Sequence, residues 1–166
     1  MKTLLLMRHA KSSWKDDSLN DHERPLKKRG RKDAKLIAKV IDKKDLVPDL
    51  ILCSTAVRAK ETAEIVVEKL GYEKEIRYMR DLYMCEPEDF IEILQSLENS
   101  FEKVMLVAHN PGLEAYLQIV DGEIEALPTG GLAYMALAVD DWADLTIESM
   151  GDLIGFWNPK ELAEKK

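Results

Sequence analysis

The sequence predicts an α/β fold: a three-layer αβα sandwich with a mostly parallel central sheet, formed by a single domain over residues 1–166. The order of the predicted elements supports this fold class. Short apolar runs alternate along the chain with segments whose apolar residues recur at helical spacing. Strands separated by helices form a parallel sheet with right-handed crossovers, so the alternation predicts that architecture. The length suits one domain with a substantial core, and no repeat or linker divides the chain.

The first half of the chain contains five expected elements. They are a strand that starts at residue 3 with the run Leu4–Met7, a helix over 26–43, a strand over 49–53, a helix over 55–70 and a weak strand over 74–78. The second half adds a helix over 87–98, a strand over 103–108, a helix over 111–120 and two strands at about 132–139 and 144–149. The charged tail after Pro159 is expected to fray.

Composition narrows the class of protein. The apolar and charged fractions are ordinary for a soluble globular protein, and no apolar stretch is long enough to cross a bilayer. The apolar start is too short for a secretory signal and runs directly into charged residues. Cys53 and Cys85 fit reduced, buried thiols better than a disulfide or a metal pair. We therefore expect a cytoplasmic protein without a membrane partner, and a monomer, since no exposed apolar stripe requires a dimer.

Charge is distributed unevenly along the chain. Residues 1–44 hold 14 basic and 6 acidic side chains, whereas the whole chain has a net charge of −7. The simplest interpretation of the basic residues is a solvated helix face together with the residues that precede the helix. A second interpretation is a local positive field that attracts an anionic substrate. Nucleic-acid binding is the third and least favoured interpretation, because the chain as a whole is acidic and the basic run has no interleaved aromatic residues.

Polar side chains follow four of the predicted strands. The carboxyl ends of parallel strands share one edge of the sheet, where ligands bind. The groups at these ends are Arg8 and His9 after the first strand, Ser54 and Arg58 after the second, Asp81 and Glu86 after the third, and His109 and Asn110 after the fourth. Two histidines, two arginines and at least one carboxylate therefore converge from distant parts of the sequence.

Each of these residues also has a purely structural interpretation. Ser54 could cap a helix, Arg58 could be a solvated helix residue, and a single histidine at a strand end is commonly a hydrogen-bonded structural group. His22 lies in a polar loop without an accompanying ligand pattern, so we interpret it as structural. It is the coincidence of the other groups on one edge that favours a functional site. The histidines lack the spacing and carboxylate company of a zinc site, so no metal and no cofactor is expected.

The converging groups suit phosphoryl chemistry. Arginine presents a planar fork of donors to phosphate oxygens, so Arg8 and Arg58 would neutralise the dianion. One histidine would attack phosphorus while the other donates a hydrogen bond to an equatorial oxygen. The helix that starts at Pro111 would direct its free N–H groups toward the same edge. Such a reaction needs positioning and charge rather than a bound cofactor.

Five segments together resemble the histidine phosphatase superfamily, whose fold is phosphoglycerate mutase-like. They are Leu6–Lys11, Asp21–Leu26 with Gly30, Cys53–Ala59 with Thr62, Asp81–Tyr83, and Val107–Glu114 with Leu127–Gly131. The SixA-type phosphohistidine phosphatases are the most similar group. The resemblance implies that His9 is the phosphorylated nucleophile and that Arg8, Arg58 and His109 complete the phosphate pocket. It also places Ser12 as a phosphate contact, and we assign Asn110 to substrate binding.

The sequence departs from the mutases and sugar phosphatases of that superfamily at the general acid. Those members carry a glutamate near the third strand, whereas this chain offers only Asp81 and Glu86 as candidates. An imidazole that leaves a phosphohistidine, already protonated on its other nitrogen, departs as a neutral species, whereas an alkoxide needs a proton much more. Residues 79–102 also contain no long insertion that could form a lid. Both features favour phosphohistidine over phosphoesters.

We therefore predict a metal-independent phosphohistidine phosphatase that acts on a phosphorylated partner protein. A broad phosphomonoesterase for small phosphometabolites is the alternative enzyme. A phosphate-binding module without catalysis is the alternative from another class, and it is disfavoured because a binding module needs no nucleophile.

Overall fold

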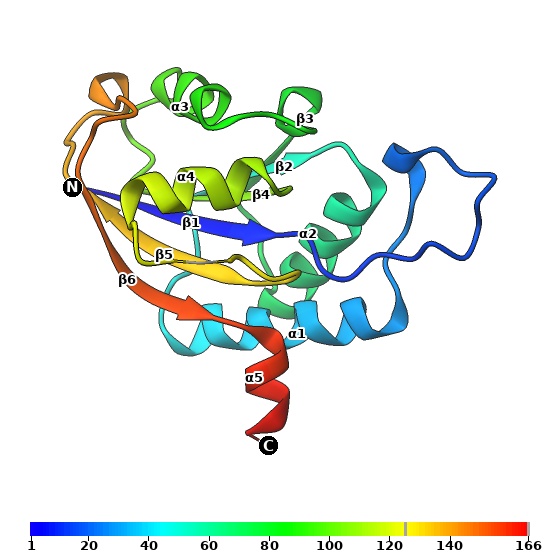
Figure 1. Cartoon of the computed structure of the whole chain (residues 1–166). Coiled ribbons are helices and arrows are strands. Elements are labelled where there is room, and N and C mark those ends of the chain that lie inside the picture. Colours follow the sequence, from blue (N-terminus) through cyan, green and yellow to red (C-terminus); the bar gives the residue numbers. More distant parts are fainter. Residues whose placement is uncertain (125, 166) are drawn as a thin grey trace.

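The computed structural model describes residues 1–124 and 126–165. Its centre is a six-stranded sheet with the order β3-β2-β4-β1-β5-β6. The strands are β1 (Lys2–Arg8), β2 (Leu50–Ser54), β3 (Glu75–Met79), β4 (Lys103–Ala108), β5 (Leu132–Leu137) and β6 (Gly151–Trp157). The first four are parallel to one another, whereas β5 and β6 run antiparallel to their neighbours. The predicted mostly parallel sheet is therefore confirmed (Figure 1).

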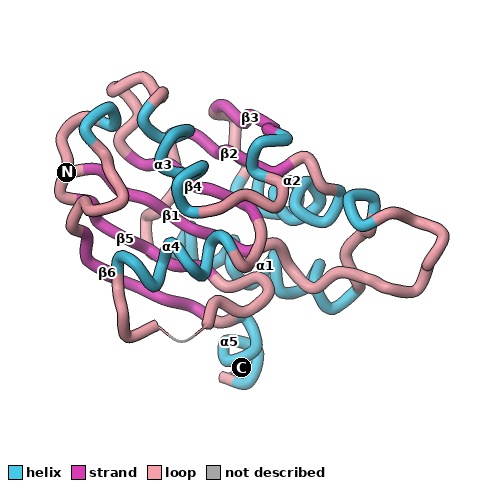
Figure 2. The backbone as a smooth tube through the Cα atoms, turned by 45° about the horizontal axis from the view of Figure 1, so that its top comes forward, coloured by secondary structure: helices cyan, strands magenta, loops and turns pink. Residues whose placement is uncertain are grey.

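The helices cover both faces of the sheet, as a three-layer sandwich requires (Figure 2). They are α1 (Lys28–Lys43), α2 (Val57–Leu70), α3 (Pro87–Gln95), α4 (Gly112–Val120) and α5 (Pro159–Glu164). Three short 3-10 helices accompany them, η1 (Asp21–Glu23), η2 (Arg80–Leu82) and η3 (Trp142–Asp144). Figure 1 shows α3 and α4 on one side of the sheet and α1 on the other. Among the described residues, no helix combines the length and apolarity that crossing a membrane requires.

Strand β1, inside the sheet, contributes side chains to the hydrophobic cores on both faces of the sheet. Leu4 and Leu6 belong to the core under α3 and α4, whereas Leu5 and Met7 belong to the core over α1 and α2. Successive side chains of a strand point to opposite faces, so a strand covered on both sides must be apolar at every position. All four side chains are fully buried. This burial fixes the register of β1 and therefore the position of the residues that follow it.

The last predicted strand was placed wrongly. We expected it at about 144–149, but the chain there forms η3 and a turn in which the Thr146 amide donates to Ser149 Oγ at 2.8 Å. Strand β6 instead spans Gly151–Trp157. The alternation of Leu145 and Ile147 resembles a strand because both contact the core. Gly151 and Gly155 weaken the strand propensity of β6. Antiparallel pairing with β5 stabilises this strand instead.

The end of the described chain is also more ordered than predicted. Residues after Pro159 were expected to fray, yet Pro159–Glu164 forms helix α5. The Asn158 side chain accepts a hydrogen bond from the Lys160 amide at 3.0 Å and caps this helix. Leu162 packs against the core over α1 and α2. Tertiary burial therefore stabilises a helix too short to form by itself.

Candidate active site

The carboxyl ends of β1 and β4 bring the two predicted catalytic histidines together. Arg8 is paired with Ala108 in the parallel register, and the His9 amide donates to the Ala108 carbonyl at 3.0 Å. His9 and His109 therefore follow neighbouring strands at the same level of the sheet. Their ring centroids lie 5.1 Å apart, and both side chains are buried.

His9 is held in one orientation by its own loop. Its Nδ1 lies 2.7 Å from the Ala10 carbonyl oxygen, an acceptor, so the ring carries its proton on Nδ1. Nε2 is then the nitrogen with a free lone pair. Burial, followed by the nearby charges of Arg58 and Arg8, lowers the pKa of His9 to about 4 despite the Ala10 contact. The ring is therefore neutral and nucleophilic at physiological pH.

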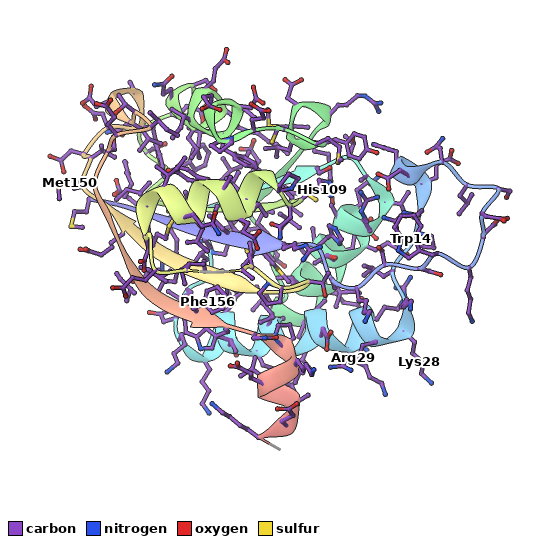
Figure 3. All side chains as sticks on the ribbon, viewed as in Figure 1. Trp14, Lys28, Arg29, His109, Met150 and Phe156 are labelled. Carbon is purple, nitrogen blue, oxygen red and sulfur yellow. The ribbon has the colours of Figure 1, made fainter. Side chains whose placement is uncertain are left out.

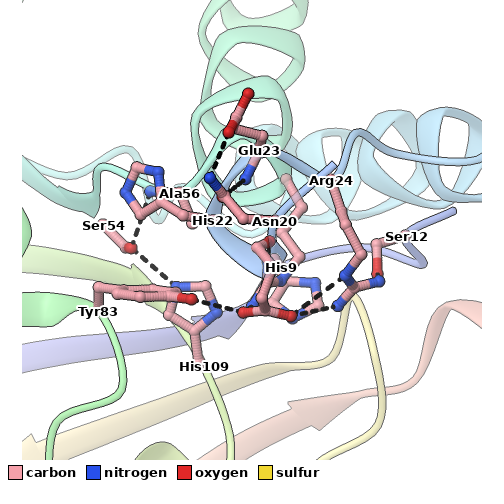
Figure 4. A network of polar contacts seen from close by, with 12 residues as sticks. His9, Ser12, Asn20, His22, Glu23, Arg24, Ser54, Ala56, Tyr83 and His109 are labelled. Carbon is pink, nitrogen blue, oxygen red and sulfur yellow. Dashed lines mark hydrogen bonds and ion pairs between the residues drawn. The ribbon is translucent and has the colours of Figure 1, made fainter. Parts of the chain in front are cut away.

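His109 is oriented by Ser54, which comes from the end of β2. Ser54 Oγ lies 2.7 Å from His109 Nε2 and also accepts the Ala56 amide at 3.2 Å (Figure 4). When the Ser54 hydroxyl donates to Nε2, the neutral ring carries its proton on Nδ1. Burial, then the proximity of His9 and Arg58, lowers the pKa of His109 to about 3. His109 therefore presents an N–H donor from Nδ1 without carrying a charge.

Both predicted arginines line the same cavity. Arg8 donates from Nη1 to the Leu127 carbonyl at 3.1 Å. Arg58, which is only 3 % exposed, donates from Nη1 to the Asp21 carbonyl at 2.6 Å and from Nη2 to Asp21 Oδ2 at 2.9 Å. Burial lowers the pKa of Arg8, against the opposing effect of Glu114. The structure therefore brings together the four residues to which the sequence assigns phosphate binding and catalysis.

Three buried nitrogens at this site lack a hydrogen-bond partner within the described residues. They are Arg8 Nε, Arg58 Nε and His109 Nδ1. A buried polar group without a partner costs free energy, so such groups call for an explanation. All three belong to residues that line one cavity together with His9, and each can act as a donor. Unpartnered donors concentrated around one cavity favour an anion bound beside His9.

The cavity has a volume of about 390 Å³, and its lining includes five arginines and lysines but one carboxylate, Asp21. Ser12 and Asn110 both line it, as predicted, but each already has protein partners. Ser12 Oγ accepts from Arg24 Nη1 at 2.8 Å, and Asn110 Nδ2 donates to the Leu127 carbonyl at 2.9 Å. In this arrangement, Ser12 and Asn110 support the walls of the cavity.

The two candidate general acids lie elsewhere. Asp81 is exposed and lines a separate cavity with residues of α3, and Glu86 caps the N-terminus of α3 through a reciprocal pair of bonds with Asp89. Neither side chain lines the cavity that contains His9. The third strand therefore ends with its polar groups turned away from the histidines, a direction that strand spacing alone does not specify.

Asp21 is the functional candidate that sequence reasoning missed. It is the carboxylate that lines the cavity among the described residues. Burial would raise the pKa of Asp21, but hydrogen bonds from Tyr83 and Arg58 and the charge of Arg58 hold it at about 2. Tyr83 donates to Asp21 Oδ2 at 2.6 Å, and its ring contacts His109 edge-on. The similarity of segments 21–26 and 81–83 to the superfamily was the available signal for both residues.

Two first-turn amides of the helix after β4 are bonded within the preceding loop, whereas we expected the first turn to offer free amides. Helix α4 begins at Gly112, and the Leu113 amide donates to the His109 carbonyl at 3.0 Å. The Glu114 amide donates to Asn110 Oδ1 at 3.2 Å. These first-turn donors therefore hold the loop after His109 in place. No group of three or more potential metal-ligating side chains occurs within residues 1–124 and 126–165.

Comparison with known proteins agrees with this geometry. The histidine phosphatase superfamily (branch 1) matches residues 4–85. An uncharacterized protein of Mycobacterium tuberculosis is 32 % identical over 93 % of this chain and 100 % of its own length. The structure named "putative phosphohistidine phosphatase SixA" from Agrobacterium tumefaciens is 29 % identical, covers 95 % of this chain and 98 % of its own, and superposes with a TM-score of 0.82.

The protein histidine phosphatase SixA complexed with tungstate has the same fold. It superposes with a TM-score of 0.81 over 96 % of this chain and 99 % of its own, at 22 % identity. The full-length relatives, the superfamily match and the cavity lined by His9, His109, Arg8 and Arg58 lead to one conclusion. The chain belongs to the histidine phosphatase superfamily, and it is a SixA-like phosphatase.

Proposed function

We propose that the protein hydrolyses phosphohistidine on a partner protein through a phosphorylated His9. The observation that carries the phosphoryl part is the set of three buried, unpartnered nitrogens on Arg8, Arg58 and His109 around the neutral His9 ring. The guanidinium groups of Arg8 and Arg58 and the His109 ring line the cavity with His9, so these residues can present donors to the equatorial oxygens of a phosphoryl group under attack. Electrostatic stabilisation by such fixed donors is commonly the largest contribution to catalysis.

The chemistry divides into two displacements. His9 Nε2 attacks phosphorus, a new N–P bond forms, and the N–P bond of the substrate breaks with its electron pair passing to the departing imidazole. Water then attacks the phosphorus of phosphorylated His9, an O–P bond forms, and Nε2 recovers its electron pair as dihydrogen phosphate, which keeps both protons of the water, leaves. The Ala10 carbonyl holds the Nδ1 proton throughout, so that His9 departs as a neutral imidazole.

The lack of a usable general acid supports a phosphohistidine substrate. Within the described residues the carboxyl group that lines the cavity is Asp21, whose pKa of about 2 leaves it without a proton at neutral pH. An alkoxide leaving group needs protonation, whereas a protonated phosphoimidazole leaves without it. The SixA name of the structural relative from A. tumefaciens is consistent with this assignment.

A substrate panel tests the proposal. Phosphoramidate and a phosphohistidine peptide should turn over, and phosphoesters of small metabolites should react far more slowly. Rapid quench with labelled substrate should trap an acid-labile phosphoenzyme that His9→Ala abolishes. Turnover of phosphoesters alone would instead indicate a phosphomonoesterase. Phosphate binding without any turnover would indicate a binding module.

A further inference from the structure

The basic side chains of the N-terminal part of the chain form one exposed surface that starts at the active site. Helix α1 carries seven basic and two acidic residues, although the whole chain has a net charge of −7. Lys27, the residue before this helix, and Lys11, whose carbonyl accepts the Lys27 amide at 2.9 Å, both line the active-site cavity. We call these nine side chains the α1 basic surface: Lys11, Lys27, Lys28, Arg29, Arg31, Lys32, Lys35, Lys39 and Lys43, all of them exposed.

Three adjacent hollows lie along this surface, from the active site to the middle of α1. The active-site cavity shares Lys11 and Thr129 with a neighbouring hollow of about 220 Å³. That hollow shares Arg29 and Asp33 with a third one of about 420 Å³, which is lined by further lysines of α1. A peptide segment of a partner that enters the active site can therefore extend beside α1 in contact with basic side chains. Figure 3 shows Lys28 and Arg29 at the end of α1 below Trp14.

The charges of the surface are poorly compensated within the protein. Among the described residues, ion pairs join Arg29 to Asp33 and Arg31 to Glu61, and none involves the seven lysines of the surface. Lys28, Lys32, Lys35 and Lys39 recur at a spacing of three or four residues, where like charges repel one another. The first turn of α1 also contains no acidic residue, which the helix dipole would favour there. Uncompensated charge of this kind suits an anionic partner.

Trp14 adds an aromatic contact at the mouth of the cavity. Its side chain lines the cavity but is 71 % exposed. One face of the indole is occupied by Arg24, whose guanidinium carbon lies 3.4 Å from the ring centroid. Arg24 is buried and donates to Asp21 Oδ1 at 3.1 Å, so the stack is fixed to the catalytic network. Rigid tryptophans with an exposed face are typical anchor residues of protein interfaces.

We propose that the α1 basic surface and Trp14 dock an acidic segment of the partner protein next to its phosphohistidine. The inference rests on the function proposed above. The size of the surface points to a protein: sixteen helical residues extend over about 24 Å at 1.5 Å each. A small metabolite in the active-site cavity would reach only its first residues. Complementary charge would accelerate encounter with an acidic partner and orient it.

Two phosphohistidine peptides of equal length test the inference, one with aspartates and glutamates beside the phosphohistidine and one with asparagines and glutamines. At low salt kcat/KM should be about tenfold higher for the acidic peptide, and the preference should fade at 0.5 M NaCl. The triple variant Lys28→Gln, Lys32→Gln, Lys35→Gln should lose the preference. Its kcat/KM for inorganic phosphoramidate should stay within about twofold, because none of the three residues lines the active-site cavity. Trp14→Ala should raise KM for both peptides more than KM for phosphoramidate.

A matched control separates local from general charge. The variant Lys60→Gln, Lys74→Gln, Lys165→Gln removes the same charge outside the surface and should retain the preference. Equal kcat/KM for the two peptides at low salt would overturn the docking surface while leaving the phosphatase assignment intact. The same holds if the control loses the preference as fully as the α1 variant. Failure to hydrolyse phosphoramidate and both peptides would instead overturn the proposed function, and the docking inference with it.

Discussion

Ser54 Oγ lies 2.7 Å from His109 Nε2, so the residue that ends β2 sets the orientation of the histidine that follows β4. Both side chains are buried, and β2 and β4 are neighbours in the sheet. The contact fixes the ring of His109, a residue that lines the cavity and whose Nδ1 has no partner among the described residues. Ser54 thus acts through His109 as a positioning residue.

Ser54→Ala should therefore lower kcat by about tenfold or more, because His109 loses the group that fixes its tautomer and direction. The variant should fold, since alanine fits the space of serine. Steady-state kinetics with phosphoramidate measures the effect, and NMR of the His109 ring nitrogens should show a mixture of tautomers. Ser96→Ala removes a serine hydroxyl that donates to the Ile93 carbonyl at the C-terminus of α3, outside the active-site cavity, and serves as the unaffected control. An unchanged tautomer in Ser54→Ala would refute the positioning role.

Arg58→Ala should reduce kcat/KM on the order of a hundredfold, because Arg58 provides a buried charged donor beside His9. Arg58→Lys restores the charge without the planar fork and should recover only part of the loss. A reduction of kcat/KM below about threefold would show that Arg58 does not stabilise the transition state, although it lines the cavity.

Asp21→Asn should strengthen inhibition by inorganic phosphate. Asp21 places a negative charge against Arg58 and Arg24 at the cavity, so it opposes an incoming dianion. Removing that charge while keeping the Asp21 carbonyl contact to Arg58 should lower the phosphate inhibition constant about fivefold, equivalent to about 1 kcal/mol. Weaker inhibition would show that Asp21 chiefly orients Arg58 rather than competing for it.

The catalytic histidines should make folding stability depend on pH. Their folded pKa values of about 4 for His9 and about 3 for His109 lie below the ordinary value of 6.5. Between pH 6.5 and about 4 the unfolded chain therefore binds more protons, and stability falls as the pH falls through that window. Each histidine should cost on the order of 1–2 kcal/mol at pH 5. Urea unfolding at pH 7 and pH 5 measures this.

His109→Gln should show a smaller loss of stability between those two pH values than the wild type, because one of the two titrating groups is gone. Phosphate should partly restore wild-type stability at pH 5, since a bound anion favours protonated histidine. Equal losses in wild type and variant would mean that His109 titrates normally in the folded protein.

Gly30→Ala tests the close approach between α1 and the segment after His9. A Cβ at position 30 would lie 2.3 Å from the Lys11 carbonyl oxygen, a backbone atom that cannot move by itself. The substitution should destabilise the protein by about 1–3 kcal/mol and lower activity by displacing the loop that carries Ser12. Gly122→Ala, where no atom lies within 4 Å, is the matched control and should change stability by less than about 1 kcal/mol. Equal thermal stability of the two variants would contradict this account.

The sequence alone predicted five of the six strands, four of the five α-helices and the proximity of His9 to His109. Buried parallel strands carry a strong apolar signal, as in Leu4–Met7, and the parallel topology then places their carboxyl ends on one edge. Strand β6 and helix α5 were misjudged because neither has a strong local pattern. Pairing with β5 supports β6, and burial of Leu162 supports α5.

Side-chain partnerships were decided by the tertiary structure. Strand order predicts which residues reach an edge, but the direction of each side chain there depends on packing between segments far apart in the chain. Asp21 therefore forms a hydrogen bond with Arg58, 37 positions away, and Ser54 forms one with His109, 55 positions away. The same packing turned Asp81 and Glu86 away from the histidines. Local sequence determines the elements because their propensities are local, whereas a site made of long-range contacts exists only when the chain has folded.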